Sequence, residues 1–578
     1  MRSHPSRLVV AVIAMAALVA TGASAPAADG AAPGGVRDRL SVAELTAEAF
    51  DPDGPVDNGY FMPMGTVEPA RHTLAGVLEV PRTNIIIGPA LFPGFSVAFF
   101  TVDGRLVPVD RDIVLTADDE WDIILSPGRV WSEPEDRGWS RASFPFVLAG
   151  KRWNESHNGL ATFLFNHSET TGLTFQIVQE ATTWPPFDAW GRVPLIYRPG
   201  PIDDENKLAA AFREELAERF PTAPLETLDA DPDLVAGVEA DLEEVTLTAL
   251  LDDGVLYLGP CHTRYGDYPY CEEMRHGVYS ITKSAGAALA LLWLAERYGP
   301  QVFDLGIADY VDVTAPHDGW NDVTFRDAID MATGIGDQTP DRLQDDGNNA
   351  DEQFLIGPFA AAATARAKLT VAFQAGNYDW GPGEVVRYNS LHTFVLAAAM
   401  DAYLKSVEGP DADLWERLTE DVLRPIGIPV APMMHTREAD GTRGIPIMGW
   451  GLFPTVQDLA KIAQLYQDRG SHDGRQLLYA DEIDRLLEGD RDYGLPVGRF
   501  NRFGQLSYGF SFWYVPFRDE RECRVFVPEM RAVGDNLVAL MPNGMTGIRF
   551  ADEGGGPRKD WFGENVMRLA DSLRPFCP

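Results

Sequence analysis

The chain has 578 residues and a net charge of −38, which comes from 86 acidic and 48 basic side chains. A surface this acidic repels phosphate groups, which argues against nucleic acids and anionic membrane faces as partners. Hydrophobic residues make up 45% of the sequence. This is enough for large cores, so disorder of the whole chain is excluded and two or three domains are expected.

The first 27 residues form a predicted secretory signal peptide. Two arginines precede an apolar run over residues 8–20, and small residues follow it. The run is shorter than the roughly 20 residues that a membrane-spanning helix needs. We therefore expect cleavage after Ala27, no membrane span, and a mature protein that is secreted or periplasmic.

Residues 28–59 form a predicted linker, and residues 60–200 form a predicted all-β module, which we expect to be a sandwich. Short apolar and β-branched runs alternate there with turn signals such as Asp103-Gly104 and Asn158-Gly159. The runs lie at residues 84–87, 97–102, 121–125, 161–165 and 173–178. A segment with prolines and glycines over residues 194–201 marks the expected end of the module.

Residues 202–578 have a mixed pattern that predicts an α+β domain. Residues 280–298 are apolar nearly all round and precede Gly299-Pro300, which predicts a buried helix ending there. The other expected elements are a helix at 207–220, a hairpin of 245–251 with 255–259, strands at 506–515, 537–541 and 547–550, and a helix at 560–573. Strands from both ends around a helical middle predict one antiparallel sheet completed by the two ends of the domain.

Four cysteines in an exported protein predict two disulfides, for which three pairings are possible. We favour Cys261 with Cys271, which would close a small loop, and Cys523 with Cys577, which would fasten the C-terminal tail. The sequence contains no CxxC motif and no cluster of cysteine and histidine, so we expect no metal site.

The sequence Ser280-Ile281-Thr282-Lys283 is an S-x-x-K motif at the start of the predicted buried helix. Positions three apart share one face of a helix, so the amine of Lys283 can reach the hydroxyl of Ser280. Burial favours the neutral amine, which can then accept the proton of the serine. The motif alone is a weak signal, but of the seven lysines in the chain only Lys283 has a serine three positions before it.

Residues 278–284 resemble the catalytic motif of serine β-lactamases, D-Ala-D-Ala carboxypeptidases and their esterase relatives. Residues 323–335 and 451–478 resemble two further segments of this penicillin-recognising family. The resemblance covers about residues 202–578 and leaves the N-terminal module outside. It implies a β-lactamase-like domain, an antiparallel sheet plus a helical region, in which Ser280 is the nucleophile and Lys283 its activating partner.

Tyr388-Asn389-Ser390 stands where the family has a Tyr-x-Asn or Ser-x-Asn motif. The resemblance makes Tyr388 the candidate general base that acts with Lys283. The third position departs from the pattern because it is Ser390 rather than asparagine. This variant resembles the esterase and 6-aminohexanoate-oligomer hydrolase branches of the family. The alternative for Tyr388 is that it is a core aromatic residue.

The third family element, a Lys-Thr-Gly or His-Thr-Gly strand, is missing from the sequence. Residues 530–536 lie near its expected place. The oxyanion hole would use the N–H of Ser280 and a second N–H within residues 531–535, where Val533 and Gly534 are candidates. Arg531 would either bind a substrate carboxylate or form a surface salt bridge.

These residues predict a secreted serine hydrolase that cleaves a small or oligomeric ester or amide through an acyl-enzyme on Ser280, without metal or cofactor. Within the enzymes, the alternatives are a β-lactamase, a D-aminopeptidase or a D-Ala-D-Ala carboxypeptidase. An alternative of another class is a catalytically silent ligand-binding protein. We expect the N-terminal module to be separable or to overhang the site, and not to supply catalytic groups.

Overall fold

The computed structural model describes most of the chain after residue 90 and two short strands before it. The described residues are 65–69, 72–73, 91–131, 139–181, 190–239, 245–263, 266–338, 341–343, 350–488, 493–519, 521–551 and 561–577. The predicted signal peptide, the predicted linker and the strand expected at 84–87 lie outside them. Within these ranges, no helix combines the length and apolar character that crossing a membrane requires.

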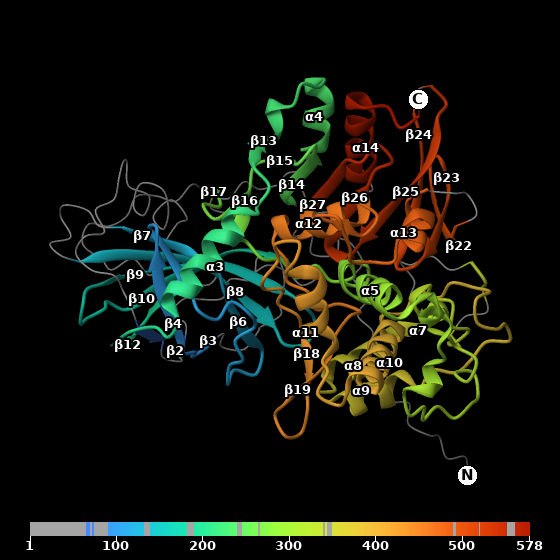
Figure 1. Ribbon diagram of the computed structural model, residues 1–578, viewed down its shortest axis with the longest axis horizontal. Helices are drawn as coiled ribbons and strands as arrows, with labels where there is room; N and C mark the ends of the chain where they lie inside the picture. The colour runs from blue at the N-terminus through green and yellow to red at the C-terminus, as the bar shows by residue number, and fades with distance from the viewer. Residues whose placement is uncertain are drawn as a thin grey trace, which may run out of the picture. The chain divides into compact units, whose positions relative to one another are not determined.

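The described part of the N-terminal module is all β, as predicted, and its main sheet is antiparallel (Figure 1). The strand order is β11-β10-β9-β8-β7-β5-β4-β1-β12, and β6 pairs with β8. The strands are β1 (Gly65–Pro69), β4 (Val97–Val102), β5 (Arg105–Pro108), β6 (Trp121–Leu125), β7 (Gly128–Trp131), β8 (Ser140–Gly150), β9 (Ser156–Phe165), β10 (Leu173–Ala181), β11 (Trp190–Val193) and β12 (Leu195–Pro199), with a separate pair β2 (His72–Thr73) and β3 (Leu91–Phe92).

Apart from β2 and β3, the strands of this module form one continuous hydrogen-bonded sheet. Strands β11 and β12 lie at its two opposite edges, although only residue 194 separates them in the sequence. Since a single residue can bridge only a short distance, the sheet has to curl until its edges approach each other. The curled sheet encloses an apolar core in which Phe144, Phe146 and Phe175 are buried.

The C-terminal domain is α+β, as predicted, and contains a second sheet with the order β13-β15-β14-β27-β26-β25-β24-β23-β22. Its strands are β13 (Thr222–Pro224), β14 (Val245–Asp252), β15 (Val255–Leu258), β22 (Leu495–Asn501), β23 (Gly504–Gly509), β24 (Phe512–Arg518), β25 (Arg524–Arg531), β26 (Leu537–Leu540) and β27 (Thr546–Ala551). Strands β14 and β27 pair antiparallel, so both ends of the domain complete one sheet, as expected (Figure 1). Strand β13 differs, because it pairs with β15 in parallel.

The helices of the domain lie mainly between the two groups of strands in the sequence. They are α3 (Glu205–Ala217), α4 (Pro232–Val238), α5 (Leu289–Tyr298), α6 (Phe325–Ile329), α7 (Ala350–Gln353), α8 (Ile356–Ala361), α9 (Ala365–Ala372), α10 (Ser390–Glu408), α11 (Leu414–Leu418), α12 (Val456–Gln467), α13 (Ala480–Leu487) and α14 (Trp561–Leu573). Helices α10 and α12 are largely buried. They belong to one large core together with α5 and part of the sheet.

The predicted buried helix after Ser280 ends as expected but begins differently. Its first part, Lys283–Ala288, is a π-helix, which continues directly into α5. Every residue from Leu289 to Ala295 is buried. The helix stops at Gly299, whose φ of 99° breaks the helical path before Pro300. A π-helical turn widens the helix locally and is frequent at functional sites.

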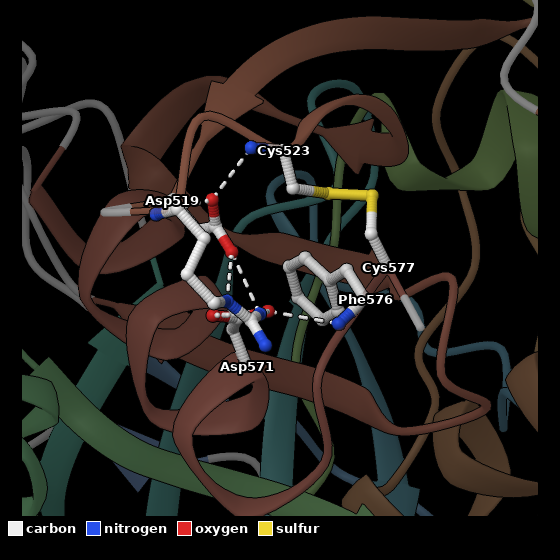
Figure 2. Close-up of a disulfide and its surroundings, with 6 residues drawn as sticks. Asp519, Cys523, Asp571, Phe576 and Cys577 are labelled. Carbon is white, nitrogen blue, oxygen red and sulfur yellow. Dashed lines mark hydrogen bonds and ion pairs between the residues drawn. A yellow bond between two sulfur atoms is a disulfide. The ribbon is translucent and has the colours of Figure 1, made fainter.

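The structure forms both predicted disulfides. Cys261 and Cys271 are joined, with their Cα atoms 5.9 Å apart, and Cys523 is joined to Cys577. Figure 2 shows the second disulfide together with the carboxylates that order its two segments. Asp519 accepts a hydrogen bond from the N–H of Cys523, and Asp571 accepts one from the N–H of Phe576. The C-terminal tail is thereby fastened beyond the end of α14.

Residues of the N-terminal module and of the C-terminal domain pack together in one hydrophobic core. All described residues belong to one compact unit of the chain, Asp38–Pro578. Leu160 and Val178 of the module lie in the same buried cluster as Tyr279 and Ile281 of the domain. The stretch just before Ser280 is therefore in contact with both parts of the protein.

Candidate active site

The S-x-x-K motif brings its hydroxyl and its amine together. Lys283 Nζ lies 2.8 Å from Ser280 Oγ and donates a hydrogen bond to it. The backbone supports this geometry, since the N–H of Lys283 also donates to the carbonyl of Ser280 at 3.0 Å. Ser280 is partly exposed, whereas Lys283 is only 1% exposed. A buried amine is thus in hydrogen-bond contact with the hydroxyl of a partly exposed serine.

The environment of Lys283 favours its neutral form. Burial lowers the pKa of Lys283 to about 7, and the nearby Glu352 carboxylate opposes this shift. Its ammonium also donates a hydrogen bond to the carbonyl of Gly449 at 2.7 Å, which fixes the direction of the side chain. An amine with a pKa near 7 can accept a proton at neutral pH, so Lys283 can activate the Ser280 hydroxyl.

Tyr388 lies beside this pair. Lys283 Nζ is 4.9 Å from the centre of the Tyr388 ring. The ring stacks on Trp513 and meets Tyr508 edge-on, both at 5.6 Å between ring centres. Tyr388 is therefore both a packed aromatic residue and a neighbour of Lys283. The residue as a whole remains partly exposed.

The two residues after Tyr388 have different surroundings. Asn389 is buried and its Oδ1 accepts the N–H of Leu391 at 3.0 Å, which caps the N-terminus of α10. The N–H of Ser390 donates to Oε2 of Glu352 at 2.8 Å. The structure thus gives Asn389 a capping role and connects Ser390 to a carboxylate.

Glu352 is a site residue that the sequence did not reveal. It lies on the short helix α7, is partly exposed, and accepts the hydrogen bond from Ser390. Burial raises the pKa of the Glu352 carboxyl, while Lys283 and Ser390 lower it. It follows an acidic stretch that is typical of a solvated turn, and no spacing in the sequence relates it to Lys283.

A buried ion pair holds Glu352 and Tyr388 in place. Arg387 Nη2 lies 2.9 Å from Oδ2 of Asp351, and the two side chains are 0% and 2% exposed. The hydroxyl of Tyr378 donates to Oδ1 of Asp351 at 2.7 Å and accepts from Arg387 at 2.8 Å. The paired residues are the sequence neighbours of Glu352 and Tyr388. The ion pair therefore sets the distance between the two segments that flank Lys283.

The segment expected to supply the second oxyanion donor follows β25. Residues 533–535 form a short 3-10 turn in which Gly534 has a φ of 77°. The N–H of Ala532 is donated to the carbonyl of Asn536 at 3.0 Å. Within the expected range, Ala532 is therefore excluded as a donor, and the N–H groups of Arg531, Val533, Gly534 and Asp535 remain candidates. The side chain of Val533 packs against the large hydrophobic core of the domain.

Arg531 is placed by a different partner. Its guanidinium forms an ion pair with Glu529 on the same strand, and its Nη2 lies near Gly563 of α14. It also lines a cavity with Glu564 and Asn565 of that helix. Arg531 thus forms an ion pair, but with a buried carboxylate and not at the surface, as one of the two expectations had it.

Comparisons with known proteins agree with the fold of the C-terminal domain. The sequence model of the family described as Beta-lactamase matches residues 249–548. No curated protein matches the chain.

Three solved structures are similar to this chain. A protein from Bacillus anthracis suggested to be a 6-aminohexanoate-dimer hydrolase is 16% identical, with a TM-score of 0.44, over 62% of this chain and 89% of its own. A D-stereospecific amidohydrolase from Streptomyces sp. is 15% identical, with a TM-score of 0.39, over 59% and 97%. A penicillin-binding protein homologue from Caulobacter crescentus is 18% identical, with a TM-score of 0.38, over 59% and 98%.

Proposed function

The chain belongs to the β-lactamase family, and from this premise we propose that it is a serine hydrolase that cleaves carboxylic esters or amides through an acyl-enzyme on Ser280. One observation carries the proposal. Lys283 donates to Ser280 at 2.8 Å and has a pKa lowered to about 7. A serine without such a neighbour is a weak nucleophile at neutral pH.

In the proposed reaction, Ser280 Oγ attacks the carbonyl carbon while Lys283 takes the hydroxyl proton. The N–H of Ser280 and one N–H from residues 531–535, other than that of Ala532, stabilise the oxyanion. The tetrahedral intermediate expels the alcohol or amine, which receives a proton from Lys283 or Tyr388. Water then attacks the acyl-enzyme, and its proton returns through the same two residues as Ser280 is released.

The substrate class that we propose is an uncharged ester, including short oligomers. The sequence has no Lys-Thr-Gly strand to bind a substrate carboxylate, and Arg531 is paired with Glu529. The third position of the tyrosine motif is Ser390, whose N–H is donated to Glu352. A negatively charged substrate would therefore lack these cationic and amide partners, and the Glu352 carboxylate near Lys283 would disfavour it.

We also propose that the protein acts outside the cytoplasm. The predicted signal peptide supports this location, and so do two disulfides, because such bonds persist in oxidising compartments. Both disulfides lie in the C-terminal domain, which carries the candidate site. Its substrate is therefore proposed to be extracellular or periplasmic.

A comparison of substrates tests the proposed activity. We expect p-nitrophenyl butyrate to be hydrolysed with a burst of p-nitrophenol, and nitrocefin to be hydrolysed with a kcat/KM lower by about 10²-fold or more. The reason is that each missing charge-assisted hydrogen bond lowers transition-state binding by about 1.5–3 kcal/mol. A higher kcat/KM for nitrocefin would restore the β-lactamase alternative. Absence of any burst with every ester would favour the silent binding protein.

The pH dependence tests the role of Lys283. Its pKa is lowered to about 7, so the proton-accepting neutral form increases as the pH rises through 7. We therefore expect kcat/KM for the ester to rise through pH 7 and then level off. In Tyr388→Phe the plateau should fall by about 10²-fold while the rising limb stays in place. Loss of the limb in this variant would assign the titration to Tyr388 instead of Lys283.

A further inference from the structure

The connection between β8 and β9 reaches from the N-terminal module to the residues just before Ser280. It comprises residues 151–155, and its Asn154 is fully buried. Asn154 has a φ of 63°, in the left-handed region that asparagine tolerates better than most residues. Trp153 next to it stacks on Trp450, and the indole N–H of Trp450 donates to the carbonyl of Arg152. The tip of this hairpin is therefore firmly docked on the C-terminal domain.

Asn154 binds the backbone of the residue that precedes the nucleophile. Its Oδ1 accepts the N–H of Tyr279 at 2.7 Å. Its Nδ2 donates to the carbonyl of Leu452 at 3.3 Å, and the same carbonyl accepts the N–H of Val278. One residue further back, the N–H of Gly277 donates to Oγ of Ser156 at 3.0 Å. The side chains of Asn154 and Ser156 thus accept hydrogen bonds from backbone N–H groups within three residues of Ser280.

The backbone held in this way is strained. Tyr279 has a φ of 45°, which is costly for a residue with a Cβ atom, by about 1–3 kcal/mol. Such a conformation persists only where the surroundings enforce it. The hydrogen bond from Tyr279 to Asn154 opposes rotation of this peptide. Because Ser280 follows directly, the dihedral angles of Tyr279 set the direction of the N–H and of the hydroxyl of Ser280.

Gly277 shows how close the two segments are. A Cβ atom on Gly277 would lie 1.6 Å from the carbonyl oxygen of Asn154. The φ of Gly277 is not in the left-handed region, so its own conformation does not call for glycine. The absence of a side chain is instead required by the approach of the hairpin. The sequence of the catalytic segment is thus adapted to the N-terminal module.

From these contacts we propose that Asn154 is a positioning residue for Ser280, and that the N-terminal module completes the active site. The inference rests on Ser280 being the nucleophile. Without the carboxamide, Tyr279 can relax to a negative φ and turn Ser280 away from Lys283 and from the oxyanion position. Displacements of about 1 Å at a reacting group lower rates by about 10²-fold.

Asn154→Gly is the variant that tests this proposal. Glycine adopts a φ of 63° without strain, so the hairpin keeps its backbone while the carboxamide is removed. We expect kcat for p-nitrophenyl butyrate to fall by about 10- to 100-fold with little change in KM, because the loss concerns the transition state. Labelling of Ser280 by a fluorophosphonate should slow by a similar factor. Asn154→Asp keeps an acceptor for Tyr279 and should recover most of the rate.

Tyr268→Phe is the matched control. Its hydroxyl donates to the carbonyl of Gly159 at 3.1 Å, a buried hydrogen bond across the same interface that does not involve residues 277–280. This variant should lower the melting temperature and leave kcat unchanged. Wild-type kcat in Asn154→Gly would overturn the proposal, and so would an equal loss of kcat in Tyr268→Phe. If the wild-type protein neither hydrolyses esters nor reacts at Ser280, the proposed function itself fails.

Discussion

Ser280→Ala is expected to abolish ester hydrolysis while the protein stays folded. Without the hydroxyl no acyl-enzyme can form, and removal of a nucleophile of this kind lowers kcat by about 10⁴-fold or more. Ser280 is partly exposed and its hydroxyl accepts a hydrogen bond from Lys283. Its loss therefore removes little packing. Turnover of p-nitrophenyl butyrate and the melting temperature, measured on the same sample, separate the two effects.

Ser284→Ala offers a control on the same helix. The Ser284 hydroxyl is buried and donates to the carbonyl of Ser511 at 2.6 Å, so its role is structural. This variant should lose stability but still react with a fluorophosphonate. The peptide that carries the adduct should contain Ser280 in both the wild-type protein and Ser284→Ala. An adduct on any other serine would show that the nucleophile has been assigned wrongly.

Arg387→Met is expected to have the largest effect on stability. The guanidinium is fully buried and pairs with Asp351, so the substitution leaves an uncompensated carboxylate in the core. Breaking a buried pair in this way lowers the free energy of unfolding by about 3–5 kcal/mol. Activity should fall as well, because the pair aligns the segments of Glu352 and Tyr388. Urea denaturation followed by tryptophan fluorescence measures the change.

An exposed ion pair of the same type provides the comparison. Arg342 pairs with Glu384 at 3.0 Å, and both side chains are more than half exposed. Arg342→Met should leave the urea midpoint almost unchanged, since water and salt screen such pairs. The double variant Asp351→Leu/Arg387→Met should recover part of the stability lost in Arg387→Met. Equal losses in Arg342→Met and Arg387→Met would contradict the role assigned to the buried pair.

Local sequence patterns were sufficient for the elements with strong periodicity or clear stop signals. The helix up to Tyr298 was predictable because its apolar run continues to Ala295 and the stop signal Gly299-Pro300 follows shortly after. The pairing of Ser280 with Lys283 followed from their spacing on a helix. The two disulfides were also predicted, although three pairings were possible. In each case the deciding interaction lies within a short stretch or concerns a rare residue type.

Interactions between distant segments could not be predicted in this way. Glu352 meets Ser390 because the ion pair between Asp351 and Arg387 aligns the two segments, one residue before Glu352 and three residues before Ser390. Asn154 precedes Tyr279 by 125 residues, and an asparagine in a hairpin is ordinarily a turn residue. The order of the strands in the N-terminal sheet could not be predicted either, because the alternation of apolar residues defines a buried face but not which strands pair.

The pairing of β14 with β27 has a consequence for the order in which the protein can fold. Leu250 pairs with Gly547, so this pair of inner strands joins positions near opposite ends of the C-terminal domain. Contacts of such separation form late and slow the folding of a domain. A chain emerging from the ribosome therefore has the S-x-x-K motif long before it has the strand that completes the sheet. Loss of the final 35 residues would remove β27 and leave the edges of β14 and β26 open to pairing with other chains.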